Sequence, residues 1–411
     1  MPDFDKVVIV GGGLAGAKTA EALRERGFTG GITLFAAESE LPYERPPLSK
    51  GYLADAGTFD KAVVHPRSWY DDERIDLQLG TRVTAIDPAR HEVRTEAGDT
   101  NHYDKLVLAT GSTPRTLPIS GADAQGVLTL RTRQDADAIR ESFGPGRRLV
   151  VIGGGWIGLE VAATARDADT DVTVLEAAEL PLLAVLGPQL GRVFAELHRD
   201  HGVDLRLGVH VTGIQTRNGA AAGVSLTDGS VVPADAVLIG VGAAPDVELA
   251  EAAGLAIDDG VVVDAALRTS DPDIYAVGDI AAHDHPVLGR RIRVEHWATA
   301  LNQPTAAAAS LLGATTEFTD LPYFFSDQFD LGMEYVGHAS PHDRVVVRGD
   351  LPRRKFIAFW LDGDDHVIAG LHVNTWDVID EIRPLITGRV RVDPARLADA
   401  EVPLSSFLQV R

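Results

Sequence analysis

The chain of 411 residues is too long for one ordinary hydrophobic core, so its length and globular composition predict two or three domains. A net charge of −22 disfavours nucleic acids and anionic membranes as partners, because both would repel the protein at long range. The absence of cysteine excludes disulfides, thiolate metal sites and a dithiol redox relay, and without a long apolar run or a signal-peptide pattern we expect a cytoplasmic protein.

The first elements expected along the chain form one βαβ unit. Residues 6–10, KVVIV, are typical of a buried strand, and a glycine-rich turn then leads into a helix that ends at Gly27. A second strand is expected in residues 32–39, ITLFAAES. The same order recurs in residues 147–179, so the sequence contains a duplicated βαβ unit and predicts an α/β fold.

The later segments extend this pattern and then leave it. Residues 103–115 and 235–246 each read as a strand that runs into a glycine turn, and we expect them to be equivalent strands of the two units. Residues 205–232 alternate and contain turn signals, which predicts a small antiparallel sheet. The C-terminal part instead favours an α+β domain, with strands in 344–349, 355–363 and 366–373 and a helix after them.

Each duplicated unit contains a glycine fingerprint between its first strand and its helix. Glycine allows the backbone to approach a pyrophosphate closely, and the helix N-terminus offers N–H groups and the positive end of its dipole. One fingerprint also fits a plain tight turn, but two copies in the same setting predict two dinucleotide sites. The glycines are Gly11, Gly13 and Gly16 in the first copy and Gly153, Gly155 and Gly158 in the second.

A carboxylate after each fingerprint is expected to bind ribose hydroxyl groups. Glu176 ends the strand after the second copy, and the following loop carries no arginine, which favours NADH over NADPH. After the first copy the candidate is Glu38, because position 37 is alanine, although Glu38 also fits a solvated loop acid. Two dinucleotides on one chain make chemical sense as a nicotinamide cofactor and a flavin.

Six segments in their order along the chain resemble the FAD-dependent, NADH-utilising ferredoxin reductases that serve bacterial cytochrome P-450 systems and ring-hydroxylating dioxygenases. These are VVIVGGGLAG, YERPPLSK, LVLATGSTPR, VVIGGGWIGLEVAA, TSDPDIYAVGDIA and FFSDQFD. The resemblance implies the glutathione-reductase fold, with two Rossmann-like domains and a C-terminal α+β interface domain. It implies a discontinuous FAD-binding domain in 1–112 and 245–319, an NAD-binding domain in 113–244 and the interface domain in 320–411.

The resemblance also implies roles for residues on the FAD side. Asp279 matches an acid that holds the ribityl chain and pyrophosphate, and Trp297 matches a contact to the pyrimidine edge of the flavin. Val83 matches a backbone contact to adenine, and the family often has an acid where this chain has Ala37. The residues implied to bind FAD are Gly11, Gly13, Ala15, Gly16, Glu38, Lys50, Val83, Arg131, Asp279, Trp297 and Phe325.

On the NAD side, the resemblance implies that the cofactor is bound by Gly153, Gly155, Gly158, Glu176 and Gly242. Glu160 matches a glutamate that faces the nicotinamide and can pair with a lysine. Lys50 matches the lysine close to the flavin ring, and these two residues are expected to act in catalysis by tuning the flavin. Phe325 stands where the family often has tryptophan, so a weaker stack against the ring is expected.

The segment PPLSK, which ends at Lys50, begins with two prolines that fix its approach to a helix. A lysine in such a place could be an ordinary surface residue. In disulfide-reducing relatives, a helix near this position carries two cysteines against the flavin, whereas this chain offers a cation. A cation near the flavin favours its reduced, anionic form, and without thiols the electrons must leave for an external acceptor.

Several charged clusters have simpler interpretations. We expect no metal site: His283, Asp284 and His285 fit a solvated loop, and Asp362, Asp364 and Asp365 fit a hairpin turn. The acidic run of residues 71–73 fits a solvated helix start. Two basic clusters fit ordinary surface charge or a docking patch for an acidic ferredoxin, namely Arg290, Arg291 and Arg293, and Arg353, Arg354 and Lys355.

The sequence therefore predicts a flavoprotein oxidoreductase for electron transfer. NADH would give hydride to FAD, and single electrons would pass to an iron–sulfur ferredoxin of the [2Fe-2S] type, which feeds a P-450-type monooxygenase or a ring-hydroxylating dioxygenase. The alternatives are a rubredoxin reductase, a cysteine-free NADH oxidase, and a flavin-bound interaction protein resembling apoptosis-inducing factor.

Overall fold

The structure is a computed structural model that describes residues 4–340 and 342–408. The chain forms two compact units, each assembled from three separate segments. The first unit contains Met1–Arg45, Phe59–Thr113 and Ala244–Pro322, and the second contains Pro46–Thr58, Pro114–Ala243 and Tyr323–Arg411. The division into three domains with the boundaries given above stays a prediction.

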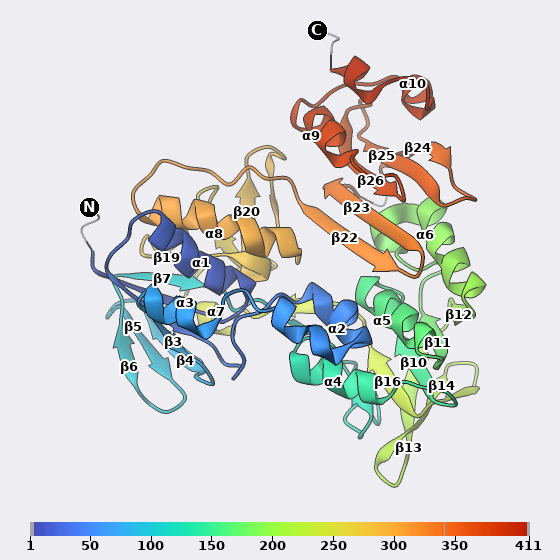
Figure 1. Ribbon diagram of the computed structural model, residues 1–411, viewed down its shortest axis with the longest axis horizontal. Helices are drawn as coiled ribbons and strands as arrows, with labels where there is room; N and C mark the ends of the chain where they lie inside the picture. The colour runs from blue at the N-terminus through green and yellow to red at the C-terminus, as the bar shows by residue number, and fades with distance from the viewer. Residues whose placement is uncertain (1–3, 341, 409–411) are drawn as a thin grey trace. The chain divides into compact units, whose positions relative to one another are not determined.

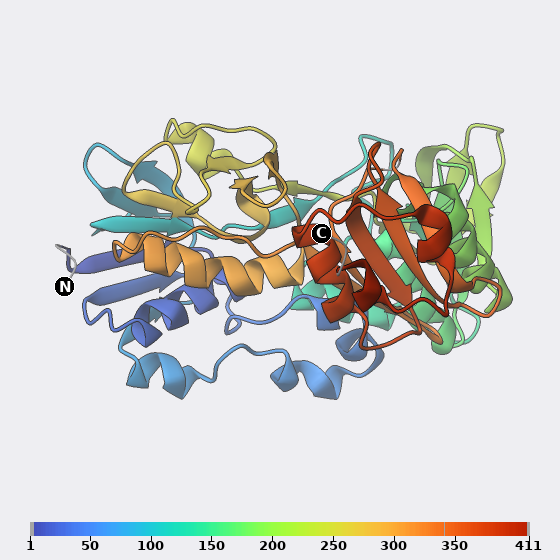
Figure 2. The same cartoon turned by 90° about the horizontal axis from the view of Figure 1, so that it is seen from above.

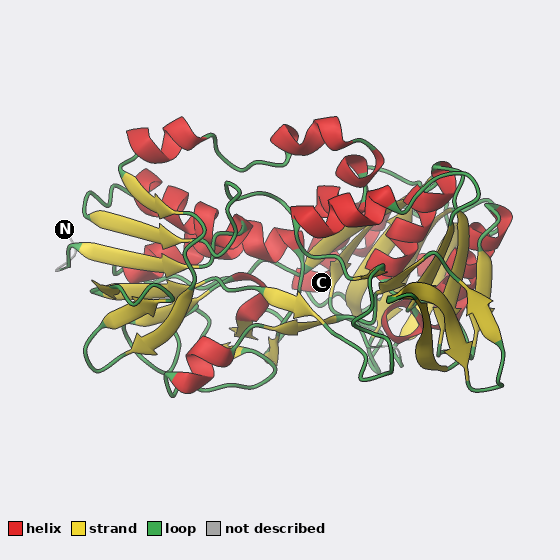
Figure 3. Cartoon of the chain, turned by 90° about the horizontal axis from the view of Figure 1, so that it is seen from below, coloured by secondary structure: helices red, strands yellow, loops and turns green. Residues whose placement is uncertain are grey.

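The first unit is built on a five-stranded parallel sheet in the order β19-β7-β1-β2-β3 (Figures 1 and 3). Its central strand is the apolar run expected from the sequence, and its side chains are almost entirely buried because layers cover both faces. The strands are β1 (Lys6–Val10), β2 (Gly31–Phe35), β3 (Ile75–Gln78), β7 (Lys105–Leu108) and β19 (Ile274–Ala276).

Helices α1 and α8 lie side by side in the first unit (Figure 1). Small residues on both helices, such as Ala20 and Ala307, are fully buried and allow this packing. The helices of the unit are α1 (Leu14–Glu25), α3 (Arg67–Asp72), α7 (Glu248–Ala252) and α8 (Trp297–Leu311), with the 3-10 turn η3 (Gly278–Ile280).

Two three-stranded sheets complete the first unit. The antiparallel sheet contains β4 (Val83–Asp87), β5 (Glu92–Thr95) and β6 (Thr100–His102), and the other contains β18 (Val261–Val263), β20 (Ala281–His285) and β21 (Arg290–Ile292). Elsewhere, β8 (Ser112–Pro114) and β17 (Ala243–Pro245) form a two-stranded ribbon, and η2 spans Ala56–Lys61.

The expectation for the acidic run at residues 71–73 was wrong. Helix α3 begins at Arg67, directly after Pro66, and ends at Asp72, so the acids lie at its C-terminal end rather than at its start. Pro66 explains the difference, because proline is well placed before or within the first turn of a helix. The buried Tyr70 holds the helix in place although its last turn is acidic.

The expectation of a solvated loop at His283–His285 was also wrong. Both imidazoles are 2% exposed and lie on β20, while Asp284 between them is exposed. The rings stand 5.2 Å apart, and Phe318 packs 5.5 Å from His283. Burial lowers the pKa of His283 to about 4, and burial also lowers the pKa of His285. These histidines therefore belong to a neutral, buried core.

We expect this buried pair to make the protein less stable in mild acid. The unfolded chain takes up a proton at His283 near pH 6.5, whereas the folded protein does so only near pH 4, so stability falls as the pH drops through this window. The loss from His283 is about 2 kcal/mol between about pH 7.5 and about pH 5. Denaturant unfolding at these two pH values measures it. The His283→Phe variant should lose less stability over the same interval, and an equal loss in both proteins would contradict the explanation.

The second unit contains a parallel sheet that repeats the pattern of the first. Its order is β12-β11-β10-β16-β9, and β10 pairs with both β11 and β16. The duplicated βαβ unit expected from the sequence is therefore confirmed. The strands are β9 (Val127–Leu128), β10 (Arg148–Ile152), β11 (Asp171–Glu176), β12 (Asp204–Leu207) and β16 (Ala236–Ile239).

Helices and a small antiparallel sheet surround this parallel sheet. The antiparallel sheet expected in residues 205–232 exists and consists of β13 (Val211–Arg217), β14 (Ala220–Leu226) and β15 (Val231–Pro233). Helix α4 begins with a capping box between Thr132 and Asp135. The helices are α4 (Arg133–Glu141), α5 (Trp156–Asp167) and α6 (Leu183–Asp200).

The C-terminal segment forms a five-stranded antiparallel sheet in the order β22-β23-β26-β25-β24, and helix α9 packs against β23 and β26 (Figure 2). The sequence predicted the last three strands but not β22 and β23. Its elements are β22 (Tyr323–Gln328), β23 (Leu331–Gly337), β24 (Arg344–Asp350), β25 (Lys355–Leu361), β26 (Val367–Val373), α9 (Ile379–Thr387), α10 (Pro394–Ala398) and η4 (Leu404–Phe407).

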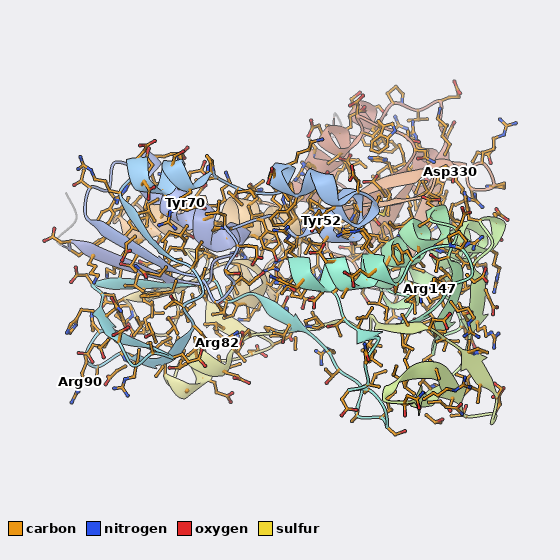
Figure 4. The ribbon with its side chains drawn as sticks, turned by 60° about the horizontal axis from the view of Figure 1, so that its bottom comes forward. Tyr52, Tyr70, Arg82, Arg90, Arg147 and Asp330 are labelled. Carbon is orange, nitrogen blue, oxygen red and sulfur yellow. The ribbon has the colours of Figure 1, made fainter. Side chains whose placement is uncertain are left out.

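The segment with the two prolines also belongs to the second unit. It forms the 3-10 turn η1 (Pro46–Ser49) followed by the short helix α2 (Gly51–Ala54). Tyr52, labelled in Figure 4, is buried and donates a hydrogen bond of 2.6 Å from its hydroxyl to Asp137 on α4. In the described part of the chain, no helix has the length and apolarity needed to cross a membrane.

Candidate cofactor-binding sites

The first glycine fingerprint forms the turn between β1 and α1. A Cβ on Gly16 would overlap the carbonyl oxygen of Gly11, and Gly11 itself has φ +122°, which side chains rarely adopt. Gly13 differs from both, because a Cβ there would meet no atom within 4 Å. Two glycines are thus required by the fold, whereas Gly13 borders open space at the N-terminus of α1.

The turn at Gly278 and Asp279 adjoins this fingerprint. A Cβ on Gly278 would lie 3.1 Å from that of Ala15, the second residue of α1. The backbone N–H of Gly278 donates to Gln303 on α8, and the Ser112 hydroxyl donates to the Asp279 carboxylate at 2.8 Å. The first unit therefore brings the expected acid beside the glycine loop.

The carboxylate of Glu38 is not a freely solvated loop acid. The Tyr43 hydroxyl donates to it at 2.5 Å and the Arg45 guanidinium at 2.6 Å, and its side chain is 29% exposed. Any ribose hydroxyl that binds there would share the carboxylate with these two donors. Val83 is buried at the start of β4, on the same unit.

Trp297 is the first residue of α8, as expected for a residue at a helix start. Its indole N–H donates to the Glu44 carboxylate at 3.1 Å, which fixes the ring. Of the other residues implied to bind FAD, Lys50, Arg131 and Phe325 belong to the second unit. The backbone N–H of Arg131 donates to Asp135 ahead of α4.

The second fingerprint repeats the geometry of the first. Gly153 has φ +108°, and a Cβ on Gly158 would overlap the Gly153 carbonyl oxygen. A Cβ on Gly155 would meet only the Gly240 carbonyl, at 3.9 Å. The second loop therefore also has one glycine that faces open space at a helix N-terminus.

Glu176 ends β11 beside this loop. Its carboxylate accepts hydrogen bonds from the backbone N–H groups of Gly154, at 2.6 Å, and Ala178, at 2.7 Å. These bonds fix an acid at the place where a ribose would be expected. Gly242 has φ +100°, and its carbonyl accepts a hydrogen bond from the backbone N–H of Arg115, a residue that the sequence did not single out.

Lys50 and Glu160 form an ion pair within the second unit. The ammonium lies 2.7 Å from the carboxylate, and the side chains are 18% and 3% exposed. The Ser49 hydroxyl donates to the same carboxylate oxygen at 2.5 Å, and the ammonium lies 5.4 Å from the centre of the Phe325 ring. Lys50 is therefore not an ordinary surface lysine.

Comparison with known proteins agrees with this architecture. A family model described as pyridine nucleotide-disulphide oxidoreductase matches residues 5–303, and a second, described as reductase C-terminal, matches residues 323–408. The chain belongs to the pyridine nucleotide-disulphide oxidoreductase family. It is an oxidoreductase of that family, and it contains none of the cysteines to which the family name refers.

Several members of the family are similar over nearly their whole length. The ferredoxin–NAD(+) reductase component of the anthranilate 1,2-dioxygenase system of Burkholderia cepacia is 44% identical over 98% of this chain and 99% of its own. Putidaredoxin reductase of Pseudomonas putida is 42% identical over 98% and 97%. The crystal structure of the covalent putidaredoxin reductase–putidaredoxin complex matches with a TM-score of 0.95 at 41% identity, over 98% of each chain. These matches confirm the predicted fold class and the predicted family.

The two basic clusters of this pyridine nucleotide-disulphide oxidoreductase lie among acids. Arg291 contacts Asp284 at 2.9 Å and Asp258 at 3.1 Å, while Arg293 contacts Glu295 and Asp259. In the other cluster, Arg354 pairs with Asp200 and Arg353 with Asp350. These ion pairs offset the positive charge of both clusters, so neither resembles a concentrated basic patch. Within residues 4–340 and 342–408, no group of three acids or histidines is arranged to hold a metal ion.

Proposed function

We propose that this protein is an NADH-dependent, FAD-containing ferredoxin reductase. The observation that carries the proposal is the pair of fingerprint loops, each with one glycine open to a ligand, on a chain without cysteine. Two open loops suit two dinucleotides, and the lack of thiols leaves an external protein as the acceptor of electrons. We also propose the domain boundaries 1–112 with 245–319, 113–244 and 320–411.

The first fingerprint has the features that an FAD pyrophosphate requires. Close backbone approach at Gly11 and Gly16, open space at Gly13 and the N-terminus of α1 would hold the phosphates, with Ala15 in the same turn. Asp279 would bind the ribityl chain, and Glu38 and Val83 would contact the adenosine half. Arg131, Trp297 and Phe325 would contact the rest of the cofactor. When bound, the flavin accepts a hydride and releases electrons one at a time.

The second fingerprint suits NADH. The open position at Gly155 would admit the pyrophosphate, while Gly153 and Gly158 keep the turn tight. The fixed carboxylate of Glu176 would accept hydrogen bonds from the ribose hydroxyl groups and would repel the 2′-phosphate of NADPH. Gly242 would border the same cofactor.

The ion pair of Lys50 and Glu160 would set the electrostatic field at the flavin. The ammonium group of Lys50 would favour the reduced, anionic flavin, and the carboxylate would limit this effect by partial neutralisation. Both groups are held before any cofactor arrives, so little reorganisation is needed during electron transfer.

The partner would be an iron–sulfur ferredoxin of the [2Fe-2S] type. Relatives over nearly the whole chain are named as ferredoxin–NAD(+) reductase components of dioxygenase systems and as putidaredoxin reductase. By this likeness, the ferredoxin would feed a P-450-type monooxygenase or a ring-hydroxylating dioxygenase. The net charge of −22 disfavours nucleic acid and anionic membrane as partners, because both would repel the protein, and so leaves a protein that accepts electrons.

Steady-state turnover with a panel of acceptors tests this proposal. We expect NADH oxidation to be fast with at least one [2Fe-2S] ferredoxin and slow with oxygen or rubredoxin as the only acceptor. A higher kcat/KM with rubredoxin would identify a rubredoxin reductase instead, and fast oxygen consumption an NADH oxidase. A long-lived complex with NADH and no turnover with any acceptor would favour an interaction protein.

A further inference from the structure

A line of buried, hydrogen-bonded polar side chains ends at the Glu160 carboxylate, on the oxygen that does not face Lys50. The Ser326 hydroxyl on β22 lies 2.7 Å from the Glu160 oxygen that does not face Lys50. The amide nitrogen of Gln328 lies 3.0 Å from the Ser326 hydroxyl, and the amide oxygen lies 2.9 Å from Nε2 of His198 on α6. All of these side chains except that of Lys50 are at most 3% exposed.

The chemistry of the atoms fixes the direction of every bond in this line. An amide oxygen can only accept, so Nε2 of His198 must carry the proton that reaches Gln328. The amide of Gln328 donates to the Ser326 oxygen, which leaves the hydroxyl proton of Ser326 to point at Glu160. Three donors in series thus end on one carboxylate oxygen, and such bonds polarise one another.

We propose that Ser326, Gln328 and His198 are positioning residues for the buried carboxylate of the ion pair. Oε1 of Glu160 is held by this line, and Oε2 is held by Ser49 and Lys50. Both oxygens of the carboxylate therefore accept hydrogen bonds, in a buried site where an unsatisfied lone pair would be costly. None of the three residues touches the ammonium group, so they act on it only through Glu160.

The state of His198 agrees with this arrangement. Burial lowers the pKa of His198 to about 4, so the ring is neutral near pH 7 and has one N–H to give. That N–H is committed to Gln328, and Nδ1 is buried without a hydrogen-bond partner. Phe329 packs 5.2 Å from the imidazole ring and fills the space around it. An imidazole placed in this way can only serve as a fixed donor.

The inference rests on the proposed function, because the ion pair matters through its effect on a bound flavin. Without the Ser326 donor, the negative charge of Glu160 would be directed more strongly at Lys50. The field of the ammonium group would then be weaker at the flavin, and the anionic reduced form would be less favoured. The expected result is a lower midpoint potential of the flavin.

Two measurements on the full-length protein test the inference. In ¹⁵N NMR of labelled histidine, with the signal assigned by His198→Gln, we expect the Nε2–H tautomer of His198 in the wild type. Gln328→Met, which keeps the length of the side chain, should change that signal. In redox titrations, Ser326→Ala and Gln328→Met should shift the flavin equilibrium toward the oxidised form roughly tenfold, which is about 30 mV for a two-electron couple.

Two further variants serve as controls. Ser326→Thr keeps the hydroxyl group on a strand and should retain the wild-type potential. Ser310→Ala removes another buried serine hydroxyl, on α8 and outside this line, and should also leave the potential unchanged. A proton on Nδ1 of His198, or an unchanged potential in both Ser326→Ala and Gln328→Met, would overturn the inference. Failure to bind flavin would instead refute the proposed function, while the NMR result would still test the direction of the bonds.

Discussion

We expect the Gly13→Asp variant to fold and to lose FAD. Gly13 has φ −87° and ψ −169°, a conformation open to any residue, and a Cβ there meets nothing within 4 Å. Aspartate is at least as favourable as glycine at the N-cap of a helix, by roughly a few tenths of a kcal/mol, so α1 should not be weakened. The new carboxylate would occupy and repel the place of the pyrophosphate.

The expected effect on FAD affinity is large. Two lost hydrogen bonds to a charged group are worth roughly 3–6 kcal/mol, which corresponds to at least about 100-fold weaker binding. The ratio of flavin absorbance to protein, and fluorescence titration of FAD into flavin-free protein, measure this loss. Circular dichroism should match that of the flavin-free wild type.

A matched control separates charge from position. Gly363 also borders open space, in the turn between β25 and β26, so Gly363→Asp introduces the same charge without steric strain. This variant should remain yellow with a full complement of flavin. A Gly13→Asp protein that also keeps its flavin would show that the first fingerprint is not the FAD site.

We expect the Gly155→Asp variant to keep FAD and to lose its response to NADH. Gly155 has φ −82° and ψ 179°, and it caps α5 as Gly13 caps α1. The carboxylate would exclude the NADH pyrophosphate and leave the first fingerprint untouched. The Kd for NADH should rise by at least about 100-fold, for the same reason as above.

Anaerobic stopped-flow mixing with NADH, beside reduction by dithionite, distinguishes the possible results. Dithionite should bleach the variant normally, because the flavin itself is intact, while NADH at wild-type concentrations should not. Gly363→Asp again provides the control and should respond as the wild type does. A Gly155→Asp protein that loses flavin but still binds NADH would reverse the assignment of the two loops.

The parts of the fold that could be predicted from the sequence are those with a strong local signal. The apolar runs at 6–10 and 148–152, each followed by spaced glycines, specify strand, turn and helix without help from distant residues. Their duplication indicated two dinucleotide sites. The glycine spacing did not, however, distinguish Gly13 and Gly155 from the other glycines. Whether a glycine borders open space depends on the surrounding fold.

Two of the missed strands, β20 and β22, share one physical cause, which is that polar residues occupy their buried positions. Strand β22 buries Ser326 and Gln328 on either side of the exposed Asp327, so its second half has the period of a strand without apolar residues. Strand β20 likewise buries His283 and His285. Hydrophobic periodicity does not detect such strands, because the partners that satisfy their polar groups come from distant parts of the chain.

The residues of the candidate site likewise fall into those that the sequence indicated and those that it did not. Motifs in the sequence placed Lys50 and Glu160 as possible partners, and the structure brings them to 2.7 Å. Ser49 and Ser326, which hold the same carboxylate, lie in the segments YERPPLSK and FFSDQFD but were not singled out, because serine is common in loops and turns. The role of Ser326 depends on a contact with Glu160, which lies 166 residues away in the chain.

The central claim is that one chain binds both cofactors and passes electrons from NADH through FAD to a protein acceptor. Anaerobic titration of the flavin-loaded protein with NADH, followed by addition of oxidised [2Fe-2S] ferredoxin, tests it most directly. We expect one equivalent of NADH to bleach the flavin, and the ferredoxin to restore the yellow colour while two equivalents of it become reduced. A flavin that stays oxidised in excess NADH, or a bleached flavin that ferredoxin leaves reduced, would contradict the claim.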